Sequence, residues 1–333
     1  MKYKWLLILS AIFLHSSCES QGKKINGVSF VASPNKITHE NIQPVKKVSA
    51  NYVSLMPFGF IEDVNSSKII FNSSRQWFGE TTEGIEQYAN EFKKSEIKLM
   101  LKPQIWVWHG KYTGLITMNS EDKWEQLENS YSKFILTYAE LAQKLNIEIF
   151  CIGTELEKFV LNRPQYWSQL ISKVKKVYSG KITYAANWDE YKRLSFWNEL
   201  DFIGIDAYFP LSDKKSPTVE ELTKGWEVHK KEIIKIREKF HKPVLFTEYG
   251  YRSVHFTGKE PWSSNRIEGS VDLDAQKNAL EVIYSEFWKE PWFAGGFIWK
   301  WFHNHDKAGG ENNNRFTPQN KPSEQTIKNA YAK

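Results

Sequence analysis

Eight short apolar runs, separated by stretches with helical spacing, organise this chain from residue 25 to its end. The runs are rich in β-branched and aromatic residues, which favour buried strands. Unbroken apolar runs indicate strands that are covered on both faces, and parallel strands need long crossovers between them. The predicted strands span residues 25–31, 51–56, 97–102, 148–153, 181–186, 201–206, 243–247 and 295–299.

The stretches between the runs place apolar residues three and four positions apart, as amphipathic helices do. Clear examples lie at residues 84–94, 124–141, 165–178, 219–240 and 273–289. The first strand contains one glycine, Gly27, and no glycine-rich phosphate loop follows it, which argues against a nucleotide-binding fold. Eight strand–helix units in roughly 300 residues match a (β/α)8 barrel better than an open doubly wound sheet. We therefore predict an α/β chain with a single TIM-barrel domain over residues 25–333.

The first residues predict an export signal. Lys2 and Lys4 precede an apolar run at residues 5–14, which is shorter than the roughly 20 residues that a membrane-spanning helix needs. Small residues then precede Cys18. This pattern resembles the signal of a bacterial lipoprotein, in which the cysteine becomes the lipidated first residue of the mature chain. His15 stands where that signal usually has an aliphatic residue, so cleavage without lipidation is the alternative.

These residues predict a signal peptide over residues 1–17 and a polar tether over residues 18–24. We expect the protein to be exported to the cell envelope and held on a bacterial membrane by a lipid on Cys18. Cys151, the second of the two cysteines, lies on a predicted core strand, so no disulfide is expected. The fold must then be stable through its core alone.

The net charge of +6 does not indicate a nucleic-acid partner. The lysines are spread over predicted helices and interleaved with glutamate and apolar positions, which is typical of solvated helix faces, and no nucleic-acid-binding motif accompanies them. No obligate protein partner is evident either. Aromatic residues make up 15% of the chain. Most of them are expected in the core, but aromatic rings at a cleft also suit sugar rings.

Two of the apolar runs end in a glutamate, at Glu155 and Glu248. Burying a lone carboxylate costs several kcal/mol unless it is paired or used, so such a residue is either salt-bridged or functional. In a barrel these glutamates end strands four and seven, and both therefore face the mouth where active sites of such barrels lie. One carboxyl could donate a proton to a leaving oxygen while the other attacks or activates water, as glycoside hydrolysis requires.

A glutamate at the end of strand four and another at the end of strand seven resembles the clan A glycoside hydrolases, which are retaining (β/α)8 enzymes. The resemblance implies that Glu155 is the acid/base, that Glu248 is the nucleophile, and that no cofactor is needed. The motif at residues 153–156 and the run at residues 203–208 are most similar to glycoside hydrolase family 113, which is known for β-1,4-mannanase activity. We therefore expect a retaining hydrolase of β-linked glycans, with β-1,4-mannan or manno-oligosaccharides as substrate.

The same resemblance suggests further site residues. The run at residues 295–299 is similar to the last strand of the clan, whose tryptophan, here Trp299, floors the subsite of the sugar being cleaved. Tyr208, near the end of strand six, is the candidate that hydrogen-bonds the nucleophile. Thr154 replaces an asparagine common in the clan, and no arginine ends strand two, so contacts to the sugar 2-hydroxyl stay open. Asn187 could supply one, or it could cap its loop.

Three tryptophans follow strands three and five, and we expect two of the three to be exposed in a cleft and to stack on sugar rings: Trp106, Trp108 and Trp188. Lys102, near the end of strand three, is expected to bind substrate or to pair with a glutamate. Its other interpretation is the Schiff-base lysine of an aldolase.

Other classes of function stay open at this stage. His303 and His305 could belong to a metal cluster with His109 and His255, but the first strand lacks the His-x-His of amidohydrolase barrels, so we expect no metal. A β-glucanase of the same clan and a carbohydrate-binding lipoprotein without turnover are the remaining alternatives.

Overall fold

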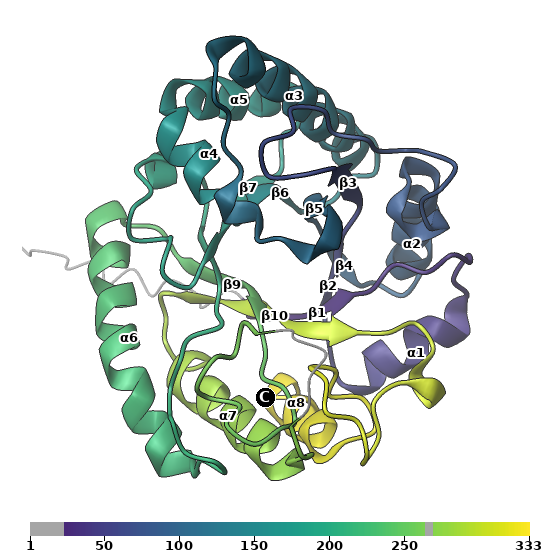
Figure 1. The fold of residues 1–333 in the computed structure, drawn as a ribbon. Coiled ribbons are helices and arrows are strands. Elements are labelled where there is room, and N and C mark those ends of the chain that lie inside the picture. The colour runs from purple at the N-terminus through teal and green to yellow at the C-terminus, as the bar shows by residue number, and fades with distance from the viewer. Residues whose placement is uncertain (1–22, 264–268) are drawn as a thin grey trace, which may run out of the picture.

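Eight parallel strands close into a barrel in the computed structural model, which describes residues 23–263 and 269–333 (Figure 1). Each corresponds to one of the eight predicted strands, and the predicted TIM-barrel fold is confirmed. The barrel order is β1-β10-β9-β8-β7-β6-β4-β2. The strands are β1 (Ile25–Phe30), β2 (Tyr52–Leu55), β4 (Lys98–Leu101), β6 (Ile149–Thr154), β7 (Lys181–Asn187), β8 (Ile203–Asp206), β9 (Val244–Tyr249) and β10 (Phe293–Trp301).

Helices surround the barrel, as Figure 1 shows. They are α1 (His39–Lys47), α2 (Thr82–Lys94), α3 (Glu121–Lys144), α4 (Glu157–Asn162), α5 (Pro164–Val177), α6 (Val219–Phe240), α7 (Leu273–Phe287) and α8 (Pro322–Tyr331). The side chains of Thr81, Ser120 and Thr218 accept backbone hydrogen bonds at the starts of α2, α3 and α6, which satisfies N–H groups that the helix leaves unpaired. Within the described residues, no helix combines the length and the apolar character needed to cross a membrane.

The strand–helix alternation is less regular than the sequence suggests. Helices α4 and α5 both follow β6, whereas the connection from β7 to β8 contains only a short 3-10 helix, η4 (Phe196–Glu199). Phe196 and Trp197 of this turn are buried, so a short connection covers this part of the barrel with two large aromatic side chains.

Two further strands, which the sequence analysis did not identify, form a separate parallel sheet: β3 (Phe58–Ile61) and β5 (Gln104–Val107). Each follows a barrel strand across a proline, Pro57 after β2 and Pro103 after β4. Proline has no N–H to donate to a strand ladder, so the barrel pairing ends there and a new pairing begins. The Gln104 N–H donates to the Pro57 carbonyl at 2.9 Å, which joins the two extensions at their start.

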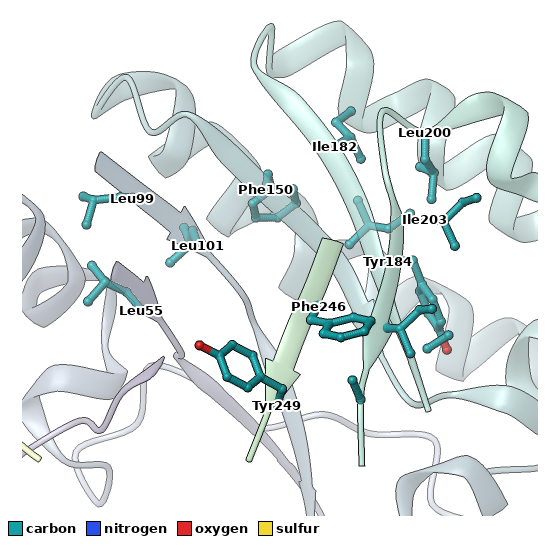
Figure 2. Close-up of a cluster of buried hydrophobic side chains, with 14 of the residues drawn as sticks. Leu55, Leu99, Leu101, Phe150, Ile182, Tyr184, Leu200, Ile203, Phe246 and Tyr249 are labelled. Carbon is teal, nitrogen blue, oxygen red and sulfur yellow. The ribbon is translucent and has the colours of Figure 1, made fainter. Parts of the chain in front are cut away.

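The strands bury side chains on both faces. On β4, Leu99 and Leu101 belong to the large cluster between strands and helices, part of which Figure 2 shows, whereas Met100 between them belongs to a second, smaller cluster. This alternation is that of a barrel whose inner and outer faces are both packed. Cys151 is a buried free thiol in the smaller cluster. The predicted signal peptide and Cys18 lie outside the described residues.

Candidate active site

A cleft of about 620 Å³ opens at the carboxyl ends of the barrel strands. Residues from the loops after several strands line it, so side chains far apart in the sequence meet there. Its polar lining includes Gln104, Glu155, Asn187, Asp206, Tyr208 and Glu248, and its aromatic lining includes Phe58, Trp106, Tyr112, Trp188, Trp262, Trp299 and Phe316. Both predicted glutamates thus line one cleft.

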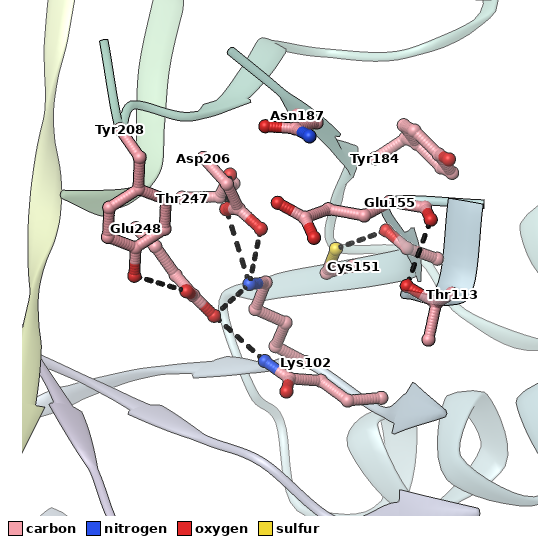
Figure 3. A network of polar contacts seen from close by, with 12 residues as sticks. Lys102, Thr113, Cys151, Glu155, Tyr184, Asn187, Asp206, Tyr208, Thr247 and Glu248 are labelled. Atoms are coloured by element: carbon pink, nitrogen blue, oxygen red, sulfur yellow. Dashed lines mark hydrogen bonds and ion pairs between the residues drawn. The ribbon is translucent and has the colours of Figure 1, made fainter. Parts of the chain in front are cut away.

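Glu248 lies on β9, and only 6% of its surface is exposed. One carboxylate oxygen, Oε1, accepts hydrogen bonds from Lys102 Nζ at 2.5 Å and from Gln104 Nε2 at 2.9 Å. The other, Oε2, accepts from the Tyr208 hydroxyl at 2.7 Å (Figure 3). Every partner is a donor, which suits an ionised carboxylate because that form has only acceptor sites. The contact predicted between Tyr208 and Glu248 is present.

Lys102 is completely buried, and its ammonium lies between two carboxylates. Besides Glu248, it donates to Asp206 Oδ2 at 3.1 Å, and Thr247 Oγ1 donates to Asp206 Oδ1 at 2.7 Å. Burial lowers the pKa of Lys102, but the charges of Asp206 and Glu248 outweigh this effect and the net pKa is raised. Burial and the charge of Glu248 raise the pKa of Asp206 to about 7, although Lys102 acts against them.

This placement decides between the two expectations for Lys102. Its ammonium has no exposed surface to offer a sugar, so the structure places it as an ion-pair partner of the carboxylates and not as a substrate contact. The sequence analysis considered a glutamate partner for Lys102 but did not identify Asp206, which lies 104 positions further along the chain.

Glu155 directly follows β6 and has a left-handed backbone, with φ of +50°. Its N–H donates to the Ala185 carbonyl at 2.8 Å, and its carbonyl accepts from Thr113 Oγ1 at 3.0 Å. Its carboxyl points toward Asp206 and Lys102 and makes no hydrogen bond to any residue that the structure describes (Figure 3). Burial, followed by the charges of Asp206 and Glu248, holds the pKa of Glu155 well above its usual value.

A buried hydrogen-bond chain, which the sequence analysis missed, supports the backbone around Glu155. The Leu156 N–H donates to the Tyr184 hydroxyl at 2.6 Å, and that hydroxyl donates to Glu190 at 2.7 Å. Glu190 also accepts from the Asn187 N–H at 2.9 Å. Burial raises the pKa of Glu190 to about 8, although both of these donors act against it. The chain therefore joins the loops after β6 and β7.

Asn187 lies in the cleft and also caps its loop, while its predicted contact with the sugar 2-hydroxyl stays a prediction. It lines the cleft, and its Oδ1 caps the next residue by accepting from the Trp188 N–H at 2.7 Å. Its amide nitrogen donates to the Tyr112 hydroxyl at 2.8 Å. Tyr112 is a cleft residue that the sequence analysis did not select, because it lies in an irregular loop without strand periodicity.

Two of the three tryptophans predicted to follow strands three and five line the cleft, Trp106 and Trp188. Trp108 is also exposed, at 50%, but lies outside the lining of the cleft. Trp188 stacks on Trp262, with ring centroids 5.3 Å apart and planes 15° apart. Trp262 was not predicted, since it lies in a long loop after β9.

Trp299 lies in the cleft, as predicted from the last strand. Gly250 allows its close approach to the loop that follows Glu248, because a side chain at this position would lie 2.6 Å from the Trp299 carbonyl oxygen. Phe316, also not predicted, lies edge-on to Tyr208 at a centroid distance of 5.9 Å. The ring of Phe316 thus covers the tyrosine that contacts Glu248.

Two of the histidines considered for a metal cluster, His255 and His305, have acidic neighbours in Asp272 and Glu324. His305 Nε2 lies 2.7 Å from Glu324, and within the described residues no group of three or more His, Cys, Asp or Glu side chains could hold a metal ion. Glu157, the first residue of α4, forms an ion pair with Arg193.

The family model of Glycoside Hydrolase Family 113 matches residues 33–321. The chain belongs to glycoside hydrolase family 113. Family 113 membership makes it a glycosidase, as predicted, and the alternative of a binding protein without turnover is set aside. No curated protein sequence matches it.

The fold of this family 113 chain is similar to solved structures of other members. One is a GH113 β-1,4-mannanase in a complex, with a TM-score of 0.81, 21% identity, and coverage of 93% of this chain and 99% of that one. Another is the GH113 β-mannanase AaManA from Alicyclobacillus acidocaldarius in complex with ManMIm, with a TM-score of 0.80, 24% identity, and coverage of 93% and 97%. A β-glucuronidase from Faecalibacterium prausnitzii is more distant, with a TM-score of 0.60, 15% identity, and coverage of 93% and 49%.

Proposed function

We propose that this family 113 glycosidase hydrolyses β-1,4-linked mannan or manno-oligosaccharides by double displacement, with retention of the anomeric configuration. The observation that carries the proposal is the contrast between two glutamates in one cleft. Glu248 is surrounded by donors, whereas Glu155 has none among the described residues and its pKa is held high. An ionised carboxylate and a protonated carboxyl are the pair that a retaining glycosidase needs.

In the first step, Glu248 attacks the anomeric carbon while Glu155 gives its proton to the glycosidic oxygen. The bond between the anomeric carbon and that oxygen breaks, and a glycosyl ester forms on Glu248. In the second step, Glu155, now ionised, takes a proton from water as the water oxygen attacks the same carbon and Glu248 leaves. One water is consumed, both glutamates return to their first state, and the two inversions give net retention.

The choice of mannan rests on family membership and on neighbours described as β-mannanases. Mannose differs from glucose in its axial 2-hydroxyl, so discrimination requires a polar group beside that hydroxyl. The Asn187 amide, held by Tyr112, is a candidate for this contact, and Trp299 is the candidate floor of the subsite. A glycosidase acting on β-glucan is the alternative within the same chemistry.

A substrate panel with stereochemical analysis tests the proposal. The mature protein is incubated with β-mannan, β-glucan and xylan oligosaccharides, and the first anomer released is identified by proton NMR. We expect turnover of the mannan series with the β-anomer formed first. Faster turnover of β-glucan would overturn the substrate, and an α-anomer formed first would overturn the mechanism.

We also propose that the protein is exported and anchored to a bacterial membrane through Cys18. The support for this proposal is the short apolar run after Lys2 and Lys4 that ends in small residues and Cys18.

A further inference from the structure

Lys102 and Asp206 lie beside Glu248, and both are almost completely buried: Lys102 has no exposed surface, and Asp206, although it lines the cleft, has 1%. Neither the two-step mechanism nor the substrate contacts use them. A buried ammonium and a buried carboxylate are costly to retain unless they are well paired, and replacing such a pair by apolar residues is often neutral or stabilising. Their effect on the reaction must therefore act through Glu155 and Glu248.

We infer that Lys102 and Asp206 are positioning residues that hold the two glutamates in opposite protonation states. Lys102 keeps Glu248 ionised and aligned for attack, and Asp206 keeps the proton on Glu155. This inference rests on the proposed double displacement, since it assigns a cause to the difference between the acid and the nucleophile.

The contacts of Glu248 support the role of Lys102. Among the donors that the structure describes around Glu248, Lys102 is the only cation, whereas Gln104 and Tyr208 are neutral. Asp206 and Glu248 are paired residues on neighbouring strands β8 and β9, so their carboxylates would repel each other without the ammonium between them.

The surroundings of Glu155 support the role of Asp206. Within the described residues, the contacts of Asp206 are all donors, from Thr247 and Lys102, which suits the ionised form. Its pKa is raised to about 7, so Asp206 carries its charge on the alkaline side of neutral pH, where Glu155 must keep its proton. The Glu155 carboxyl points toward Asp206, and both side chains line the cleft (Figure 3). Burial is the largest cause of the raised pKa of Glu155, and the charge of Asp206 is the next. The charged and titratable groups that face Glu155 come from six loops and strands and comprise Asp206, Glu248, Glu190, Lys102, Tyr112 and Tyr208.

The first test removes one charge. Asp206→Asn keeps the shape of the side chain and the oxygen that accepts from Thr247, but it removes the negative charge beside Glu155. The pKa of Glu155 should fall, so the alkaline limb of kcat/KM against pH should move down by about one pH unit. At neutral pH, hydrolysis of an unactivated mannooligosaccharide should slow by about tenfold or more. Release of dinitrophenol from an activated aryl glycoside should change much less, because that leaving group needs no proton.

The second test removes the cation and measures dinitrophenol release. Lys102→Met removes the ammonium between the two carboxylates and leaves the more distant Lys300 as a cation that acts on Glu248. The pre-steady-state release of dinitrophenol, which reports attack by Glu248, should therefore slow by about a hundredfold. The double variant Lys102→Met/Asp206→Asn removes the repulsion, so it should release dinitrophenol faster than Lys102→Met alone. On the dinitrophenyl glycoside, Asp206→Asn should thus have little effect in the wild-type chain and should speed release in the Lys102→Met chain.

Lys321→Met is the matched control. Lys321 is also a buried lysine, but its ammonium is held by Ser253, Asn313 and the Arg315 carbonyl, and no carboxylate of the described residues contacts it. Its variant should keep both limbs of the pH profile in place. Thermal unfolding of all variants checks the fold, and if Lys102→Met does not fold, the pH profile of Asp206→Asn still decides.

The inference is overturned if folded Asp206→Asn keeps the alkaline limb of the wild type, or if the double variant is no faster than Lys102→Met. Failure of the proposed mechanism is a separate result. In that case the wild-type enzyme itself releases the α-anomer first, and this result does not depend on the variants of Lys102 and Asp206.

Discussion

Glu155 and Glu248 are the same residue type in the same cleft, and only their neighbours make them chemically different. Glu248 accepts three hydrogen bonds, one of them from an ammonium, while Glu155 faces Asp206 and has no donor among the described residues. The strand-end position of each could be predicted from the sequence. Which protonation state each glutamate holds depends on its surroundings, which include Lys102, Gln104 and Asp206.

The Glu155→Ala and Glu248→Ala variants should give different products from an activated aryl β-glycoside in the presence of azide. Glu155→Ala should keep much of its first step, because a good leaving group needs no acid, and azide should then attack the glycosyl-enzyme to give the β-azide. Glu248→Ala should form no glycosyl-enzyme, so azide could give only the α-azide by direct inversion. NMR of the products distinguishes them, and azide products exchanged between the two variants would reverse the assignment.

Trp299→Ala should lower kcat/KM for manno-oligosaccharides by about a hundredfold, because loss of a stacking surface allows the sugar to move relative to both glutamates. Trp108→Ala is a suitable control, since this tryptophan is exposed but does not line the cleft. Steady-state kinetics with circular dichroism check both variants. Unchanged kinetics for folded Trp299→Ala would remove this residue from the substrate site.

At the scale of the elements, short extensions beyond the barrel strands form much of the site. Strands β3 and β5 begin after Pro57 and Pro103, and β5 carries Gln104 to Glu248 and Trp106 to the cleft. The predictions from periodicity ended at the barrel strands, since four residues after a proline are too few to show a strand pattern. They therefore included Trp106 as a loop residue and missed Gln104.

The hydrogen-bond chain through Tyr184 should support both stability and activity. Tyr184→Phe removes the acceptor of the Leu156 N–H and a donor to Glu190, both buried, so we expect a loss of about 2 kcal/mol in the free energy of unfolding. It should also lower kcat/KM, because Leu156 holds the backbone next to Glu155. Urea unfolding and kinetics on the same preparation measure the two effects.

Tyr178→Phe is the matched control for this variant. The Tyr178 hydroxyl is also buried and donates to the Ile147 carbonyl, before the start of β6 and away from the cleft. It should lose stability while kcat/KM stays at the wild-type value. A Tyr184→Phe variant with equally unchanged kinetics would limit the chain to a structural role.

At the scale of the whole molecule, the signal predicted for residues 1–17 leads us to propose that the barrel lies outside the cytoplasm. Expressed in a bacterial host, the wild-type protein should sediment with membranes, while Cys18→Ala should appear in the soluble fraction. One acyl chain binds membranes only marginally, whereas several hold firmly. Equal solubility of the two proteins would contradict lipidation.

The sequence by itself determined the barrel and the two strand-end glutamates, because hydrophobic periodicity is a local pattern that repeats in every strand and helix and because parallel strands bring their carboxyl ends to one mouth. The resemblance of these strand ends to clan A glycoside hydrolases also indicated Tyr208 and Trp299. These predictions required no knowledge of how any particular loop folds.

Only the tertiary structure decided which side chains meet around the glutamates. Lys102 contacts Asp206 over 104 positions and Glu248 over 146, and Trp262 and Phe316 reach the cleft from long irregular loops. Glu190 is buried although its loop is polar. Such contacts depend on the direction in which each loop leaves its strand, and that direction is set by packing against neighbouring loops. No short stretch of the sequence predicts this direction.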